Sequence, residues 1–233
     1  MKQVLFFFFA LFILASCRFT TGSGNIITET RSAGNFKGIS VGGAFDVEVK
    51  IGPVTQVTVE ADDNIIKYIE ITTSGNILKI RTENLHNYSN VHMKVYITTP
   101  ALTSINASAS ADVKVLDLIK NDEKLSFHAS SSADIEAEID APEVEAKVSS
   151  SGSVTLRGKT KNYTAQASSS GDIKSAELLT ENTDVTVSSS GSAEVHASVS
   201  LNARASSSGD IVYHGAANVT KSVSSSGSVE KKD

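Results

Sequence analysis

The segment SSSGDIKS, from Ser168 to Ser175, decides the fold of this chain because it is one of seven similar segments. If the Gly or Ala of each copy is taken as the reference residue, successive references are 18 to 22 residues apart. A period of about 20 residues over this many copies is typical of a solenoid, in which each repeat packs against its neighbours. The reference residues are Ala111, Ala133, Gly152, Gly171, Gly191, Gly209 and Gly227.

Apolar and polar residues alternate within each repeat. Around Gly171, for example, Ala167 and Ile173 are apolar, whereas Gln166 and Lys174 are polar. Such alternation places one set of side chains in a core and the other in solvent, as in a β-strand. No stretch has a helical period long enough to compete. The repeats therefore predict an all-β, narrow two-sided β-solenoid with two strands and one tight serine corner per coil of about 18–22 residues.

The position two residues before each reference is expected to face inward beside the corner, where only a small side chain fits. The reference Gly is expected to supply the positive φ of a sharp turn. An unpaired buried hydroxyl costs about 1–3 kcal/mol, so we expect these hydroxyls to bond to each other or to the turn backbone. The expected buried serine ladder consists of Ser131, Ser150, Ser169, Ser189, Ser207 and Ser225.

The last copy carries charges at positions that are apolar and inward in earlier copies. Lys221 and Lys231 occupy these positions. Charged side chains on an open strand edge block pairing with another chain, so both lysines are expected to guard the final coil. This protection opposes uncontrolled stacking but leaves room for a regulated partner.

The chain before the repeats is also β-patterned, with longer steps between its turns. Residues 29–107 are expected to begin the same solenoid and to cap its first edge, because the end of a repeat stack needs a cover. A separate small β domain is the alternative. Residues 108–233 form the Ser-Gly repeat solenoid.

The first 17 residues resemble the leader of a bacterial lipoprotein. A basic start precedes an apolar run from Val4 to Ala15, which is too short to span a bilayer as a mature helix. Leu-Ala-Ser-Cys17 then resembles a lipobox, which predicts a signal peptide at 1–16, a lipid on Cys17 and a flexible tether at 17–28. An ordinary secretory signal with a chance Cys is the alternative. The lipid would contact a membrane, and we expect an outer-membrane lipoprotein facing the surface or the periplasm.

Composition excludes several classes of function. The net charge is −5, which offers no basic patch for nucleic acid. The single Cys can form neither an internal disulfide nor a Cys-rich metal site. We expect no cofactor, no metal and no catalytic residue. The regular repeat also leaves little room for the long loops and clustered carboxylates of β-helical carbohydrate enzymes.

An acidic series follows the reference residues: Asp112, Asp134, Asp172 and Asp210. From Asp134 onward, Asp alternates with Ser, which keeps like charges off adjacent coils. This structural explanation suffices, although a row of weak Ca²⁺ or sugar-hydroxyl sites is an alternative. The histidines His86, His92, His128, His196 and His214 are expected on the surface.

Several segments together resemble one bacterial family. FKGISVGGAFDVEVKIG at 36–52, VEADDNIIKYIE at 59–70, TPAL at 99–102 and the Ser-Gly repeats resemble the "putative auto-transporter adhesin, head GIN domain" family over roughly residues 33–230. The resemblance implies a right-handed parallel β-helix similar to pectin-lyase-like folds, an envelope location and an adhesion role. The family has no established catalytic residues to carry over.

These patterns lead to one functional expectation and two alternatives. We expect a lipid-anchored, non-enzymatic cell-envelope protein that presents a β-solenoid for adhesion or envelope interaction, with a glycan or an envelope or host surface protein as partner. A periplasmic structural scaffold that binds another envelope protein through a solenoid edge is the first alternative. A carbohydrate-active enzyme is the second.

Overall fold

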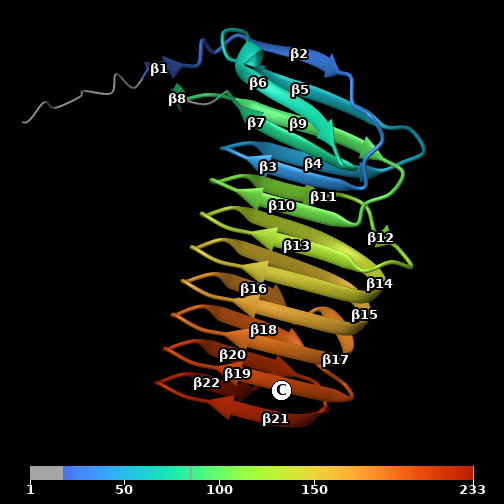
Figure 1. Ribbon diagram of the computed structural model, residues 1–233, viewed down its shortest axis with the longest axis vertical. Helices are drawn as coiled ribbons and strands as arrows, with labels where there is room; N and C mark the ends of the chain where they lie inside the picture. The colour runs from blue at the N-terminus through green and yellow to red at the C-terminus, as the bar shows by residue number, and fades with distance from the viewer. Residues whose placement is uncertain (1–17, 84–85, 233) are drawn as a thin grey trace, which may run out of the picture.

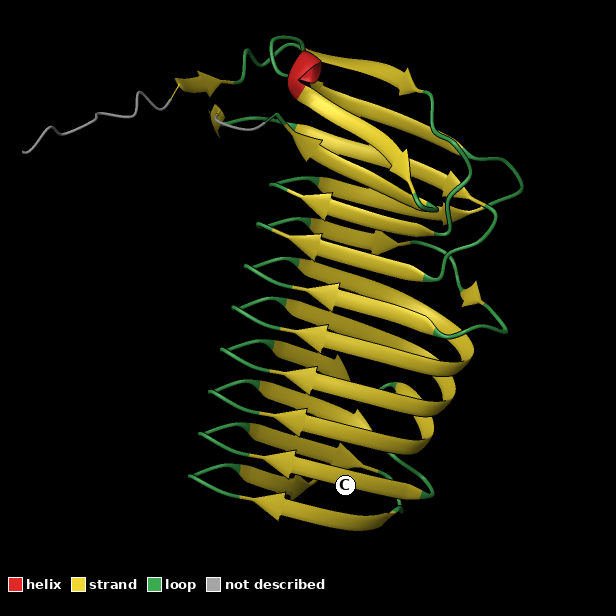
Figure 2. Ribbon diagram, viewed as in Figure 1, coloured by secondary structure: helices red, strands yellow, loops and turns green. Residues whose placement is uncertain are grey.

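The computed structural model describes residues 18–83 and 86–232, which form a tall stack of β-coils (Figure 1). Apart from one 3-10 turn, η1 (Ile66–Tyr68), every regular element in these two ranges is a strand. Near strands run toward the serine corners and far strands run away from them, so the chain descends as a right-handed coil (Figure 2). The expected all-β, right-handed, two-sided β-solenoid is therefore confirmed. Within these two ranges, no helix is long and apolar enough to cross a membrane.

The repeats form two parallel faces that meet at the serine corners. Each strand pairs with the equivalent strand of the next coil, so that Asn106 lies beside His128 and Asp112 beside Asp134. Each coil has a second corner, at the opposite end of the strands from its serine corner. β14 (Asp134–Val148) and β15 (Ser153–Ala167) run through this second corner and belong to both faces. The other front strands are β10 (Ser104–Ser108), β13 (Leu125–Ala129), β17 (Leu178–Val187), β19 (Ser200–Ala205) and β21 (Asn218–Val223). The other rear strands are β11 (Asp112–Val115), β12 (Ile119–Lys120), β16 (Asp172–Ser175), β18 (Ser192–His196), β20 (Asp210–His214) and β22 (Ser228–Lys231).

Inward side chains form continuous columns in which most residues are small or β-branched. These residue types suit a pleated surface, and burying their apolar area contributes about 25 cal/mol per Å². The front column is at most 1% exposed and consists of Ile105, Phe127, Ala146, Ala165, Val185 and Ala203. The rear column is at most 2% exposed and consists of Val113, Ile135, Val154, Ile173, Ala193 and Ile211.

Ser175 is a polar residue at an inward position, and the structure provides its partners. Its hydroxyl donates to the carbonyl of Glu194 at 3.0 Å and lies 3.1 Å from the hydroxyl of Tyr163. Both Ser175 and Tyr163 are buried, and burial raises the pKa of the Tyr163 phenol. The pair therefore satisfies two buried hydroxyls that would otherwise destabilise the core.

The serine corners differ from the sequence-based expectation. The two residues before each reference, which are serines in every copy but the first, have positive φ, as at Ser150 (52°) and Ser151 (62°). The amide of Gly152 donates to the carbonyl of Ser149 at 3.1 Å. This geometry is a type I′ turn, which requires positive φ at both central residues. Two left-handed residues interrupt the strand alternation and turn their side chains outward. The buried ladder is therefore wrong, because Ser131, Ser150, Ser169, Ser189, Ser207 and Ser225 are all exposed.

Backbone groups, rather than hydroxyls, link one corner to the next. The amide of Ser151 donates to the carbonyl of Ser169 at 3.2 Å, and equivalent bonds join the other corners. Gly152 is buried and is not a positive-φ residue. A Cβ at this position would lie 3.0 Å from the carbonyl carbon of Ala129 in the preceding coil. Glycine is therefore favoured by the close approach of two coils, and not by the turn conformation expected above.

The amino-terminal segment begins the solenoid and then covers it. β3 (Gly38–Gly42) and β4 (Asp46–Ile51) pair in parallel with β10 and β11. On the other side of these strands the next pairings are also parallel, and the antiparallel pairs beyond them end the stack, which leaves its first coil covered. The cover consists of β2 (Ile26–Arg31), β5 (Gln56–Asp62), β6 (Ile69–Ser74), β7 (Ile77–Thr82) and β9 (Met93–Thr99).

The expected tether at 17–28 is wrong for residues 18–28, because these residues make defined contacts. β1 (Arg18–Thr21) pairs in parallel with β8 (His86–Ser89). Asp62 then accepts hydrogen bonds from the amides of Gly24 and His92, both at 2.7 Å. The His92 amide is the largest influence lowering the pKa of the Asp62 carboxyl. The predicted signal peptide, residues 1–16, and the predicted lipid-attachment residue, Cys17, lie outside the described residues.

In the final coil, one lysine contacts residues of both faces. Lys221 Nζ donates to the carbonyl of Val229 at 3.0 Å and lies 5.0 Å from the centroid of the Tyr213 ring. Its aliphatic stem covers apolar surface while its ammonium group remains at the edge. Lys231 lies on β22, in register with Tyr213. Both lysines are exposed, and their role in guarding the edge remains a prediction.

Candidate functional site

The front face of the repeats carries mainly hydroxyl and amide side chains. Its outward residues lie three, five and seven positions before the reference of each copy, and we call this surface the hydroxyl–amide face. The position three residues before the reference is Ser in all seven copies. Formal charges on this face occur only as two ion pairs, Lys147 with Glu145 and Arg204 with Asp184. The face is therefore close to neutral in a protein whose net charge is −5.

A shallow groove of about 510 Å³ follows this face. Outward serines line one side, which we call the floor, and the longer outward side chains two positions before them line the other, which we call the wall. The inward residues Ala107, Ala129, Val148 and Ala167 lie between these columns, so the repeat itself produces the groove. The groove crosses the strands from β3 to β17, which is five coil steps or about 24 Å at the usual strand spacing. The floor consists of Ser108, Ser130, Ser149, Ser168 and Ser188, and the wall of Asn106, His128, Lys147, Gln166 and Thr186.

The wall of the groove has hydrogen-bonding capacity that the protein does not use. Within residues 18–83 and 86–232, the side chains of Asn106, Gln166 and Thr186 have no hydrogen-bond partner. His128 Nε2 lies 3.2 Å from the hydroxyl of Ser126. Burial, followed by the charge of Lys147, lowers the pKa of His128, which favours the neutral imidazole. The groove can therefore exchange neutral hydrogen bonds with a ligand.

The rear face has the opposite character. One and three positions after the references, its outward residues include seven carboxylates and two lysines. Ion pairs between coils neutralise part of this charge, as between Lys114 and Glu136 at 3.2 Å. Strand alternation and parallel register thus separate a charged face from a hydroxyl–amide face on one narrow solenoid.

The acidic series lies along the rear face. Ser192 lies between Asp172 and Asp210 in register, and its hydroxyl donates to Asp172 Oδ1 at 2.5 Å. Asp112 and Asp134 are direct neighbours, and Asp46 lies on the other side of Asp112. Burial is the largest influence raising the pKa of Asp112, followed by the charges of Asp134 and Asp46. The Asp-Val-Glu-Val segment at 46–49 resembles Asp-Val-Lys-Val at 112–115, a signal from which Asp46 could have been found.

Two histidines also stack on the rear face, and both have partners. His196 and His214 lie in register on adjacent strands. His196 Nδ1 accepts from the amide of Thr180 at 3.2 Å, and His214 Nε2 lies 2.9 Å from Glu194 Oε1. Across the described ranges, no group of three or more His, Cys, Asp or Glu side chains could hold a metal ion.

One sequence pattern typical of serine hydrolases has a different structure here. Gly38-Ile-Ser-Val-Gly42 matches Gly-x-Ser-x-Gly, which in hydrolases forms a sharp strand-to-helix turn. Here the whole segment is strand β3, paired on both sides, and Ser40 lies at the end of the groove. His128 occupies the same column two strands away, at about 9.6 Å, which is beyond hydrogen-bond reach.

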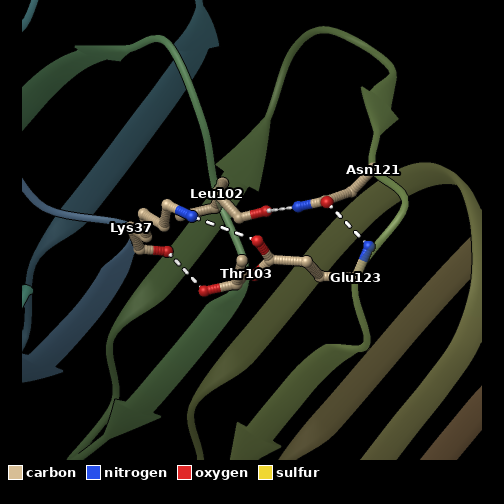
Figure 3. A network of polar contacts seen from close by, with 5 residues as sticks. All are labelled: Lys37, Leu102, Thr103, Asn121 and Glu123. Atoms are coloured by element: carbon tan, nitrogen blue, oxygen red, sulfur yellow. Dashed lines mark hydrogen bonds and ion pairs between the residues drawn. The ribbon is translucent and has the colours of Figure 1, made fainter.

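A further polar network joins the cap to the first repeat (Figure 3). Lys37 Nζ bonds to Glu123 Oε1 at 3.1 Å, and the hydroxyl of Thr103 donates to the carbonyl of Lys37 at 3.0 Å. Asn121 Nδ2 donates to the carbonyl of Leu102 at 3.1 Å, while its Oδ1 accepts from the amide of Glu123. These groups bond mainly to one another, so the network fixes the second corner of the first coils.

Solved structures with the same architecture come from species of Bacteroides and Parabacteroides. A protein described as a putative adhesin from Bacteroides fragilis is 20% identical, with a TM-score of 0.83 over 91% of this chain and 98% of that one. A putative lipid binding protein from Parabacteroides distasonis is 21% identical, with a TM-score of 0.77 over 93% and 100%. A putative adhesin from Parabacteroides merdae is 19% identical, with a TM-score of 0.73 over the same shares. These similarities show the fold.

The sequence itself shows the family. No curated protein matches this chain. The family match extends over residues 35–217, which includes the cap except for β2, the front groove and all but the last serine corner. The chain therefore belongs to the family described as "Putative auto-transporter adhesin, head GIN domain".

Proposed function

We propose that this protein is a lipid-anchored, non-enzymatic component of the cell envelope that presents its solenoid for adhesion. The family description and the adhesin descriptions of two structural neighbours support this function. The observation that carries the proposal is the position of β1. The chain enters at the capped end of the stack, opposite β21 and β22 (Figure 1). A lipid on Cys17 would therefore hold the cap near a membrane.

This orientation would project the repeats away from the bilayer. From β7 to β21 the front strands make eight steps, which is about 38 Å at the usual strand spacing. The hydroxyl–amide face would occupy the last six of these steps, from β10 to β21 or about 29 Å, and would be accessible from the side. A rigid solenoid keeps such a surface at a fixed height because each coil is bonded to the next.

Lipidation and localisation provide the first test. We expect the mature full-length protein to partition with outer membranes and to incorporate labelled fatty acid, and a Cys17→Ala variant to do neither. Intact cells exposed to protease should lose the protein if it faces the surface. A protein that remains intact under these conditions, while a periplasmic control is also protected, would contradict surface adhesion.

A scaffold that binds another envelope protein is the second candidate, and the open final coil favours it. Among the described strands, β21 pairs only with β19, and β22 only with β20. Val223 at this edge is 50% exposed. Protease protection together with a copurifying protein that is lost in a Val223→Lys variant would support the scaffold over the adhesin.

A further inference from the structure

We infer that the groove on the hydroxyl–amide face binds an uncharged polysaccharide that lies parallel to the solenoid axis. This inference rests on the proposed adhesion function and names its ligand class. The groove combines a defined trough of about 510 Å³ with amide and hydroxyl groups that have no partner in the described chain. Neither the family description nor the described neighbours assign a ligand to this surface.

Charge indicates a neutral ligand. The only lysine in the groove, Lys147, is paired with Glu145, and no other formal charge lines the trough. A polyanion would find no free cation here, and a polycation would be attracted to the carboxylates of the rear face instead. The pKa of His128, lowered by burial, keeps the centre of the groove uncharged near neutral pH.

Hydrogen-bond chemistry indicates a carbohydrate. The side-chain amides of Asn106 and Gln166 each offer donors and an acceptor, and the serine and threonine hydroxyls offer both. Vicinal sugar hydroxyls and acetamido groups are complementary to this mixture. The groups repeat about every 4.8 Å along the axis, a distance close to one unit of an extended β-linked polysaccharide. The groove would therefore accommodate about five units, one for each coil step.

A protein partner is less well matched to this surface. Protein interfaces depend on buried aromatic or aliphatic anchors. The exposed large apolar side chains of the described residues, such as Leu179 and Val199, lie outside the groove. The groove lining contains no Phe, Tyr or Trp ring on which a sugar could stack, so the affinity per unit should be low. Binding should consequently strengthen with glycan length, because each added unit meets another coil.

A variant with a larger side chain in the groove, compared with a matched variant outside it, tests the inference. We would titrate the full-length purified protein with cellohexaose, chitohexaose, mannohexaose and laminarihexaose, and with polygalacturonate as a charged comparison. At least one neutral hexamer should bind, more tightly than its dimer. Ser149→Gln adds a neutral side chain to the groove floor and should weaken binding at least tenfold. Ser206→Gln is the matched control, because Ser206 occupies the same column outside the groove, and it should change binding less than twofold.

Three outcomes would overturn the inference: no binding of any neutral hexamer at millimolar concentration, preferential binding of polygalacturonate, or equal effects of Ser149→Gln and Ser206→Gln. Circular dichroism and thermal unfolding of both variants show whether the fold is retained. A lipidated, surface-exposed protein that binds no neutral hexamer would contradict only this inference. Glycan binding by a protein that carries no lipid would contradict only the proposed anchoring.

Discussion

Replacement of Gly209 by alanine should destabilise the protein, because the added methyl group would lie too close to the backbone of the preceding coil. A Cβ at Gly209 would lie 2.8 Å from the carbonyl oxygen of Val187 and 3.0 Å from the amide nitrogen of Ser188. Both neighbours are backbone atoms in a hydrogen-bonded coil, so neither can rotate away as a flexible side chain would. Overpacking of a well-packed interior costs about 1–3 kcal/mol, and we expect about 2 kcal/mol here. This corresponds to a decrease in Tm of about 4–8 °C for a chain of this size.

The matched variant is Ser208→Gly, one residue away. Ser208 is exposed and has a φ of 60°. Glycine relieves about 1 kcal/mol of left-handed strain but loses about 0.5–1 kcal/mol more conformational freedom on folding. We therefore expect a change in unfolding free energy of less than about 0.5 kcal/mol, since the two effects nearly cancel.

Urea unfolding followed by circular dichroism measures both variants. Repeat stacks can unfold in parts, so hydrogen exchange at the amide of Ser188 gives a local comparison. The reasoning fails if Gly209→Ala is tolerated while Ser208→Gly destabilises the protein, because turn conformation rather than close approach would then require glycine. It also fails if exchange at Ser188 is unchanged in Gly209→Ala.

Three further changes probe the core and the cap. Ser175→Ala leaves the buried Tyr163 hydroxyl unpaired and should cost about 1–3 kcal/mol, whereas adding Tyr163→Phe should restore part of this loss in a double-mutant cycle measured by urea unfolding. Phe127→Ala should cost about 3–5 kcal/mol through a core cavity, and an effect below 1 kcal/mol by the same method would contradict its burial. Because the pKa of Asp62 is lowered, its stabilising effect should be complete above the ordinary value of 3.8 and should disappear as pH falls through the lower folded-state pKa. Asp62→Asn should therefore lower the free energy of unfolding at pH 7 and reduce the loss of stability between pH 7 and pH 3. Urea midpoints that match those of the unmodified protein at both pH values would refute this role.

Much of the coil could be predicted because the alternation of apolar and polar residues is a pattern within each short segment. Ile173 and Ala167 lie inward, and Gln166 and Lys174 outward, as the two-residue alternation requires. The corners were predicted at the right places but with the wrong conformation. Alternation assumes extended backbone, and two consecutive left-handed serines such as Ser150 and Ser151 break it. Serine rarely adopts this conformation, so no local preference indicated it.

The candidate groove could not be predicted from the sequence in the same way. Its residues come from strands far apart in the sequence, from Ser40 on β3 to Thr186 on β17. The parallel pairing of β3 with β10 brings Ser40 beside Asn106, 66 positions later. Between Ser40 and Asn106 the chain forms the antiparallel cap. This insertion makes their separation much longer than one repeat, so the sequence period does not pair them. The same interruption concealed Asp46 beside Asp112.

The sequence by itself determined the length of each coil, the inward residues and the places where the chain turns. These follow from periods of two and about 20 residues, which any stack of strands must obey. Only the tertiary structure decided the left-handed serine turns, the glycine contacts between coils and the separation of a charged face from a hydroxyl–amide face. The physical reason is that these features depend on backbone atoms of neighbouring coils, whose approach and register no single repeat specifies.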